Sequence, residues 1–345
     1  MKKLVIFNLR TDPASSVLGA SIDWIEAFRD HFLVTDVVST HVGKDVQLKN
    51  VRILELGGGS TRARIRAILR LFKFAIYLIV RRKEYLVFHH MSPRTAVFPG
   101  ILFMIFRIPQ GLWYSHSSRP LALKLSARIV DFIFSSEENS LPLKVQNTHF
   151  VGHGISLKRF GTNQPLGSRN WAILFVGRIS PIKKLTHLID EVALLGKKLP
   201  IMLIGPQSDM KYIEELKNCA SAQNVSLTID KPVNYDDVHS VMKKFKYFYS
   251  GMRNSVDKSA LEAAMSGCLV LTIDSGTQDL SGMKRVWEKF VSSDISTIHN
   301  QIELLESLEE REIKVLQETV RNESIRRNSL EDTITRIASI MMASQ

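Results

Sequence analysis

Short apolar runs alternate along the chain with segments in which apolar positions recur at helical spacing. Apolar runs of roughly four to eight residues are typical of buried strands, whereas the spacing i, i+3, i+4 predicts amphipathic helices. Clear helical patterns are KLTHLIDEVALL, MKYIEELKNCASA and YDDVHSVMKKF. The predicted strands are 3–8, 33–39, 51–56, 85–89, 111–115, 131–135, 148–152, 171–176, 200–204, 225–229, 246–250 and 268–273. This alternation predicts an α/β protein in which helices cover both faces of parallel sheets.

The predicted strands are too many for one sheet, and the chain of 345 residues is long enough for two domains. The segment GTNQPLGSRN, residues 161–170, is rich in Gly, Asn, Pro and Ser and is therefore the expected linker. We expect two Rossmann-like, doubly wound domains, residues 1–163 and 164–325. A C-terminal helix, 326–345, is expected to pack back on the first domain. Because ligands of such sheets bind beyond the carboxyl ends of the strands, the residues that follow strands are the candidates for function.

Composition limits the class of protein. The two cysteines, Cys219 and Cys268, form no C-x-x-C pair, and no histidines cluster at metal-ligand spacing, which argues against a disulfide framework or a structural zinc site. Free thiols suit a reducing cytoplasm. The apolar run 4–7 is too short for a signal peptide, and the stretches 74–80 and 96–106 fall short of the ~20 residues of a membrane span. We expect a cytoplasmic protein that is soluble or peripheral.

Positive charge is concentrated in the first half of the chain. Residues 1–170 hold 24 Lys and Arg against 11 Asp and Glu, whereas residues 171–345 hold 22 against 23. Segment 60–83 is amphipathic, and two interpretations remain open: a helix that packs on the core with a solvated basic side, or a contact with an anionic membrane surface. Nucleic-acid binding has little support, because no motif for it is present and the basic residues lack interleaved aromatics. The apolar positions of this segment are Ile65, Ile68, Leu69, Phe72, Ile76 and Ile79, and the basic ones are Arg62, Arg66, Arg70 and Lys73.

The loop GRISPIKK follows the predicted strand WAILFV. Gly177 allows a tight turn, and Arg178 and Lys183 come just before the next helix. Two cations at a helix N-terminus favour a pyrophosphate site, although an ordinary basic surface loop has the same pattern.

The stretch NSVDKSALEAAMSGCLVL predicts a short helix followed by a strand. Ser259 and Glu262 have the spacing of a capping box, and Gly267 suits the position just after a helix. Glu262 therefore either caps the helix or contacts a ligand.

Three motifs resemble one family. FVGRISPIKK resembles the VGR-x-x-x-x-K-G segment of retaining, nucleotide-sugar-dependent glycosyltransferases of the large family-four type, which have two Rossmann-like domains (the GT-B fold). LEAAMSGCLVL resembles their LEAMA-x-G-x-PVV, and FVGHGISLKRF resembles their V-x-NGID-x-x-x-F. The motifs cover the second half of the chain, and over residues 1–110 the resemblance rests on the layout of elements.

The resemblance implies roles for single residues. Arg178 and Lys183 match the cations that bind the donor diphosphate and stabilise the leaving group. Glu262 matches the second glutamate of the family's E-x7-E signature, which holds the nucleotide ribose. The first glutamate is replaced by Asn254, which puts the contact with the donor sugar in doubt. Lys258 is a further candidate for a diphosphate contact.

Other candidates follow from their places at strand ends. His116, in GLWYSHSSRP, is either a contact for the donor sugar, as the resemblance implies, or a loop histidine bonded to backbone. Gly19, in RTDPASSVLGAS, and Thr277, in DSGTQDLSG, are candidate donor contacts, as is the turn at Gly177 described above. His89 and His90 end a strand with no third ligand nearby, which argues against metal binding, and a structural role is favoured over a contact with the acceptor or the cleft.

Together the patterns and the resemblance predict a glycosyltransferase that moves a sugar from a nucleotide-diphosphate sugar to a saccharide or lipid-linked acceptor, and the resemblance implies that the anomeric configuration is retained. The resemblance implies that it needs no metal and no cofactor besides the donor, and that it acts in bacterial surface polysaccharide synthesis. Two alternatives remain. A nucleotide-sugar epimerase has a similar fold, and a non-catalytic nucleotide-sugar-binding partner would explain Asn254.

Overall fold

The computed structural model describes residues 2–343 except 14, 16–18, 45, 47, 58–59, 117, 162–163, 254–255 and 289–294. The chain forms two compact units. Unit 1 consists of Met1–Gly154 together with Leu330–Gln345, and unit 2 consists of Ile155–Ser329. Each unit is built around its own parallel sheet, so the predicted class, α/β with two Rossmann-like domains, is confirmed.

The sheet of unit 1 has seven parallel strands in the order β3-β2-β1-β4-β5-β6-β7. From β1 the chain first builds one side of the sheet and then returns to build the other, which is the doubly wound arrangement. The topological switch therefore lies between β1 and β4. The strands are β1 (Lys3–Thr11), β2 (Leu33–Val42), β3 (Arg52–Glu55), β4 (Tyr85–His90), β5 (Gln110–Trp113), β6 (Phe132–Ser135) and β7 (Thr148–Phe150).

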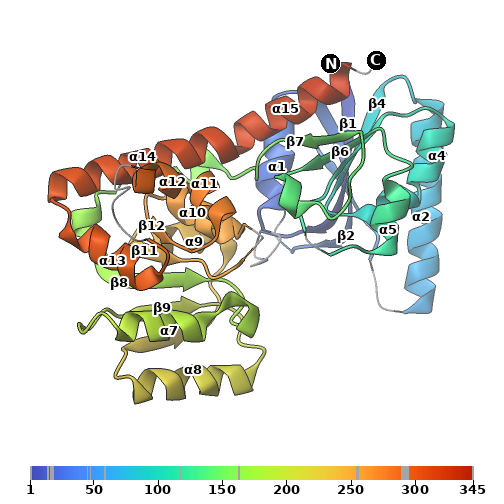
Figure 1. Ribbon diagram of the computed structural model, residues 1–345. Coiled ribbons are helices and arrows are strands. Elements are labelled where there is room, and N and C mark those ends of the chain that lie inside the picture. The colour runs from blue at the N-terminus through green and yellow to red at the C-terminus, as the bar shows by residue number, and fades with distance from the viewer. Residues whose placement is uncertain are drawn as a thin grey trace. The chain divides into compact units, whose positions relative to one another are not determined.

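Helices cover both faces of this sheet (Figure 1). On one face, Trp24 and Phe28 of α1 (Ser21–Phe28) and Ile334 of α15 (Leu330–Ala343) pack against Phe88 and its neighbours. On the other face lie α2 (Thr61–Val80) and α4 (Gly100–Ile105), with Phe74 and Phe103 in the core. The short helices α3 (Pro93–Val97) and α5 (Leu121–Ser126) and the 3-10 turn η1 (Glu138–Ser140) complete unit 1.

The sheet of unit 2 has five parallel strands in the order β10-β9-β8-β11-β12. Its central strand is β8, and the switch lies between β8 and β11. The strands are β8 (Asn170–Val176), β9 (Ile201–Ile204), β10 (Leu227–Asp230), β11 (Phe245–Tyr249) and β12 (Leu269–Leu271). The helices are α6 (Leu157–Phe160), α7 (Leu185–Ala193), α8 (Met210–Ala222), α9 (Tyr235–Met242), α10 (Lys258–Met265), α11 (Ser275–Ser281), α12 (Met283–Trp287), α13 (Ile298–Ser307) and α14 (Glu310–Asn328), with 3-10 turns η2 (Leu166–Ser168) and η3 (Pro181–Lys183).

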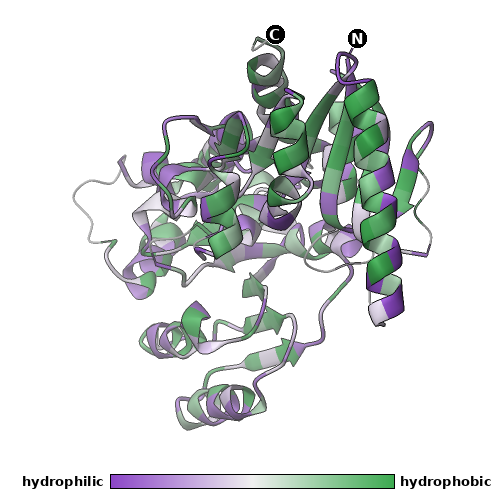
Figure 2. Ribbon diagram, turned by 90° about the vertical axis from the view of Figure 1, so that its right-hand side faces the viewer, coloured by the Kyte–Doolittle hydropathy of each residue, from purple (hydrophilic) through white to green (hydrophobic). Residues whose placement is uncertain are grey.

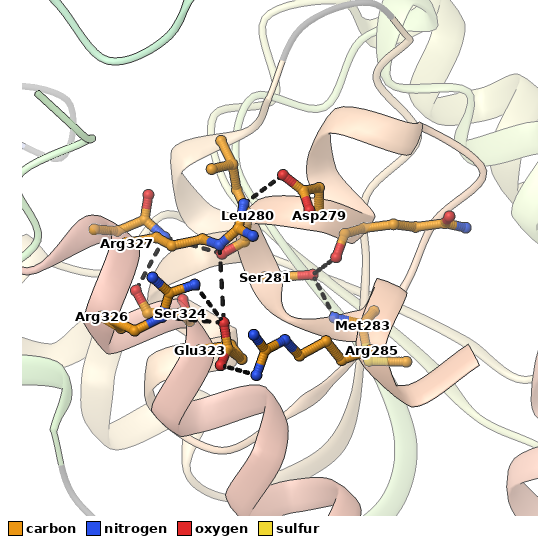
Figure 3. Close-up of polar contacts among 11 residues, drawn as sticks. Asp279, Leu280, Ser281, Met283, Arg285, Glu323, Ser324, Arg326 and Arg327 are labelled. Carbon is orange, nitrogen blue, oxygen red and sulfur yellow. Dashed lines mark hydrogen bonds and ion pairs between the residues drawn. The ribbon is translucent and has the colours of Figure 1, made fainter. Parts of the chain in front are cut away.

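A polar network fixes the end of α14 to the rest of unit 2 (Figure 3). The carboxylate of Glu323 pairs with Arg285 of α12 at 2.6 Å. Arg327, one turn later, pairs with Asp279 of α11, and the side chain of Asn328 donates to a backbone carbonyl of α11 at 2.9 Å. The last turn of α14 therefore belongs to unit 2.

The expected domain boundaries differ from those of the structure at both crossings. Residues 155–163, expected in the first domain, lie in unit 2, because Phe160 of α6 packs edge-on against Tyr235 of α9 with ring centroids 5.9 Å apart. Residues 326–329, expected in the C-terminal helix, also lie in unit 2 through the network around Glu323. The helix from Leu330 onward belongs to unit 1.

Candidate functional site

Three glycine-bearing loops meet at the carboxyl edge of the unit 2 sheet. Gly177 follows β8, Gly205 follows β9 and Gly251 follows β11 within two residues, and these strands are neighbours. A Cβ on Gly205 would lie 1.8 Å from the carbonyl oxygen of Gly177, and one on Gly251 would lie 2.1 Å from that of Lys183. Only glycine permits such close approach of two backbones. The loops at the carboxyl edge therefore pack backbone against backbone, and of the three glycines only Gly177 is partly exposed.

Lys183 lies at this edge and is held by an ion pair. Its ammonium is 2.6 Å from the carboxylate of Asp257, and the two side chains are 15% and 18% exposed. Lys183 ends η3, in the loop after β8, whereas Asp257 precedes α10, after β11. Arg178, in the same loop as Lys183, is exposed and has no hydrogen bond or ion pair with the residues that the structure describes. One predicted cation is thus fixed by a neighbouring loop and the other is open to solvent.

Glu262 does not cap its helix. The N-cap of α10 is Asp257, so Ser259 lies inside the first turn and Glu262 in the second, and the expected capping box does not form. The buried carboxylate of Glu262 instead accepts a hydrogen bond from the hydroxyl of Tyr235 at 2.9 Å and pairs with Lys258 at 3.1 Å. The prediction that Glu262 is more than a cap is consistent with this geometry, although its ribose contact stays a prediction.

Tyr235 is the residue that sequence reasoning missed. Its ring lies between the guanidinium of Arg159, 5.1 Å from the ring centroid, and the ammonium of Lys258, at 5.2 Å. The Lys258 ammonium also donates to the Tyr235 hydroxyl at 3.2 Å. A signal for Tyr235 was present, because it begins the helix after β10 and so stands at the same sheet edge as Gly177. The structure thus joins Lys258, Glu262 and Tyr235 in one cluster.

Three further predicted donor contacts fare differently. Asn254 lies outside the residues that the structure describes. The backbone N–H and the hydroxyl of Thr277 both donate to Asp274, at 2.8 and 2.9 Å, because Asp274 caps α11. The amide of Thr277 is therefore taken up within the helix cap, and its contact with the donor stays a prediction. Gly19 belongs to unit 1, where it is buried in the turn before α1 and donates to the carbonyl of Ser15 at 3.0 Å.

His116, also in unit 1, is an exposed loop histidine bonded to backbone. Its ring Nδ1 accepts from the backbone N–H of Ser118 at 2.9 Å, and its backbone N–H donates to the carbonyl of Ser140 at 2.9 Å. The alternative of a backbone-bonded loop residue describes this geometry. A contact with donor sugar stays a prediction.

His89 is a structural residue, as the sequence favoured. It is fully buried, stacks on Phe7 with centroids 5.0 Å apart, and bonds to Thr95 and Gln110 at 3.0 and 3.3 Å. Burial lowers the pKa of His89 to about 3, so the ring is neutral. His90, one residue later, is 3.3 Å from the side-chain oxygen of Asn8. Within the described ranges, no three His, Cys, Asp or Glu residues are grouped so that they could hold a metal ion.

Comparison with known proteins gives the fold. No protein-family model matches the chain, and no curated protein matches it in sequence. Among solved structures, Anabaena HepE in complex with UDP and glucose matches with a TM-score of 0.75 at 14% identity, over 99% of this chain and 100% of that one. A glycosyltransferase from Rickettsia africae matches with a TM-score of 0.71 at 12% identity, over 99% and 98%. A putative UDP-N-acetylglucosamine 2-epimerase from Listeria monocytogenes matches with a TM-score of 0.61 at 13% identity, over 100% and 97%. The chain therefore has the GT-B fold.

Proposed function

We propose that the protein is a glycosyltransferase that uses a nucleotide-diphosphate sugar. The observation that carries this proposal is the carboxyl edge of the unit 2 sheet, where the closely packed glycine loop after β8 carries the two cations Arg178 and Lys183. This edge suits a diphosphate, because cations are ligands that phosphate oxygens prefer. The likeness in fold to HepE, which was crystallised with UDP and glucose, supports a UDP-sugar as the donor.

In this proposal each side chain has a distinct task. Arg178 and Lys183 stabilise the negative charge that develops on the diphosphate oxygen as its bond to the sugar C1 breaks. Glu262 holds the ribose through its carboxylate, and Lys258 adds a contact to the diphosphate. Because these cations stabilise the leaving group, the transfer needs no metal. It proceeds with retention of the anomeric configuration, as the resemblance to family-four enzymes implies. His116 contacts the donor sugar.

The acceptor in this proposal is a saccharide or a lipid-linked saccharide. The protein works in the cytoplasm, at the inner face of the cell membrane, in the synthesis of bacterial lipopolysaccharide or exopolysaccharide. The excess of Lys and Arg in residues 1–170 supports this location, because an anionic membrane surface attracts positive charge. In the described residues no helix is long and apolar enough to cross a membrane.

Ligand-dependent stabilisation tests the donor site. A ligand at about 100 times its dissociation constant stabilises the folded state by about 2.7 kcal/mol. We expect UDP-sugars, in a panel with GDP-, ADP- and CMP-sugars, to raise the melting temperature. Lys183→Ala should weaken UDP binding about tenfold, because one charged hydrogen bond is lost. Lys198→Ala, which removes an exposed lysine of the same unit, is the matched control. No shift with any nucleotide sugar would refute the proposal.

A nucleotide-sugar epimerase is the second candidate, because the Listeria protein shares the fold. The two reactions differ in what happens without an acceptor. An epimerase converts the UDP-sugar into its epimer, visible by proton NMR, whereas a transferase leaves it intact until an acceptor is added. Binding without either reaction would instead identify a non-catalytic nucleotide-sugar-binding partner.

A further inference from the structure

Helix α2 has two apolar faces, and only one of them is covered. Leu71, Phe74, Ala75 and Leu78 are buried against the sheet of unit 1. Of the six apolar positions singled out in the sequence, Ile79 packs against this core, whereas Ile65, Ile68, Leu69, Phe72 and Ile76 are 46–56% exposed. At about 100° per residue these five positions fall on one stripe, which is turned by about 125° around the helix from the buried one. The interpretation that this helix packs on the core with a solvated basic side is therefore confirmed for its buried positions, but most of the apolar positions singled out in the sequence lie outside that contact.

The first half of α2 makes no core contact. Residues 61–70 include no buried side chain, although the helix begins with a good cap, in which the Ser60 hydroxyl accepts from the Ala63 N–H at 3.2 Å. In Figure 1 this half of α2 extends past α4 and α5 of the same unit. Helices in water gain most of their stability from an apolar face that packs on something. The exposed stripe is the face available for that purpose.

Helix α4 continues the apolar surface. It contacts α2, and Ile101, Met104, Ile105 and the following Phe106 are 41–61% exposed. In Figure 2, which turns this side of unit 1 toward the viewer, apolar stretches run along the long helix in front and alternate with hydrophilic ones. Large apolar side chains that cluster in this way mark an interaction surface, whereas single exposed ones need no explanation.

The charge beside this surface is of one sign. Segment 60–83 holds eight Lys and Arg and no Asp or Glu. Helical spacing places Arg62, Arg66 and Lys73 along one flank of the exposed stripe. None of the helix's five basic side chains has a hydrogen bond or ion pair with another residue among those the structure describes. The flank is therefore free to meet an anionic partner.

We propose that the exposed faces of α2 and α4, here called the α2–α4 surface, dock on a bilayer that contains anionic phospholipid. A helix with one apolar stripe and a basic flank lies in the plane of the membrane, with its apolar side chains among the acyl chains and its cations among the headgroups. A second copy of the chain is a poor occupant, because it would bring like charges together. The proposal deepens the membrane contact of the proposed function, but it does not depend on glycosyl transfer.

Co-sedimentation with vesicles tests the docking. The full chain, without donor, should bind vesicles of phosphatidylcholine and phosphatidylglycerol far more strongly than vesicles of phosphatidylcholine alone, and less strongly at high salt. Replacing Arg62, Arg66 and Lys73 by Gln should weaken binding by about fivefold for each residue, or about a hundredfold together. Replacing Lys211 and Lys217 of α8 by Gln is the control, because both are exposed lysines of unit 2. Equal binding to both vesicle types would overturn the proposal.

Insertion of the apolar stripe is tested separately. Phe72 and Phe150 are both exposed phenylalanines of unit 1, at 47% and 49%. With anionic vesicles the tryptophan emission of Phe72→Trp should shift to shorter wavelength, and that of Phe150→Trp should not. A protein partner would leave the vesicle spectra unchanged. Concentration-dependent dimers that Ile68→Ser abolishes, with no vesicle binding, would assign the surface to a second copy. Either result would overturn the proposal.

Discussion

Removing the Tyr235 hydroxyl gives a sharp test of the Glu262 cluster. Tyr235→Phe keeps the ring, with its contacts to Arg159 and Lys258, and deletes the hydroxyl, which donates to the Glu262 carboxylate at 2.9 Å and accepts from the Lys258 ammonium at 3.2 Å. Tyr235 is 6% exposed and Glu262 4%, so water does not readily replace the hydroxyl. A hydrogen bond to a charged group contributes about 1.5–3 kcal/mol. Since Lys258 still pairs with the carboxylate, we expect unit 2 to lose about 2 kcal/mol of its free energy of unfolding.

A double-mutant cycle isolates this hydrogen bond from other effects of the substitution. Glu262→Met keeps a straight side chain of good helix propensity but removes the acceptor. If the hydroxyl and the carboxylate interact as the structure has them, urea unfolding of the single and double variants should give a coupling energy of about 1–2 kcal/mol. Tyr212→Phe is the control, because its buried hydroxyl accepts from the backbone N–H of Leu185 at 3.1 Å and has no hydrogen bond with a carboxylate of the described residues.

The same variant links the cluster to function. If Glu262 holds the donor ribose, a carboxylate that has lost one of its two anchors should bind UDP more weakly, by about tenfold. Isothermal titration of Tyr235→Phe with UDP measures this. A coupling energy near zero would refute the assignment of the hydrogen bond. Unchanged UDP affinity with full coupling would leave the bond in place and remove Glu262 from the donor site.

Three further outcomes follow from the structure. The folded-state pKa of His89, about 3, lies below its ordinary value of 6.5, so the unfolded chain takes up the proton first as pH falls. The free energy of unfolding of unit 1 should therefore fall by about 2 kcal/mol between pH 6.5 and pH 5. In urea unfolding His89→Asn should show a smaller fall, and an equal fall would contradict the argument. Gly205→Ala should lower the free energy of unfolding by about 3 kcal/mol, because its Cβ would meet the Gly177 carbonyl. Gly196 has open space around it, so Gly196→Ala should lower the same quantity by only about 1 kcal/mol. Thermal or urea unfolding measures both values. Asp257→Asn removes a carboxylate beside the proposed diphosphate and should tighten UDP binding several-fold by calorimetry; weaker binding would show that Asp257 positions the lysine instead.

The strands were predictable because their signal is local. Every predicted run contains an observed strand or overlaps one, since strands buried on both faces appear as apolar runs whatever their neighbours are, and even the less buried edge strands β3, β7 and β10 keep enough apolar residues to be found. The prediction that Gly267 follows the end of a helix is also confirmed, because a positive φ of 80° after α10 favours glycine. Helix α8 matches its predicted pattern from Met210 to Ala222.

The failures share a physical cause, which is competition between two equally good local patterns. In α2 both apolar stripes have helical spacing, so periodicity predicts the helix but not which stripe meets the sheet. Ser259 and Asp257 are both good N-cap residue types, and the helix begins at the earlier of the two. Segment 161–170 has the composition of a linker, but α6, which precedes it, still belongs to unit 2. The reason is that Phe160 packs against Tyr235, a residue far along the chain.

The candidate site could be predicted only in part, because its electrostatics depend on residues that meet across loops. The sequence places Lys183 after β8 and Lys258 after β11, but it does not show that each lysine has a carboxylate partner. Lys183 pairs with Asp257 from another loop, and Lys258 pairs with Glu262 one turn along α10. The ligand-free edge is therefore closer to neutral than the count of cations suggests. Donor binding at this edge has to exchange the Asp257 partner of Lys183 for phosphate, whereas Arg178 needs no such exchange. The contribution of Lys183 to donor affinity should accordingly be smaller than that of a free lysine, which is why a tenfold effect is expected for its removal.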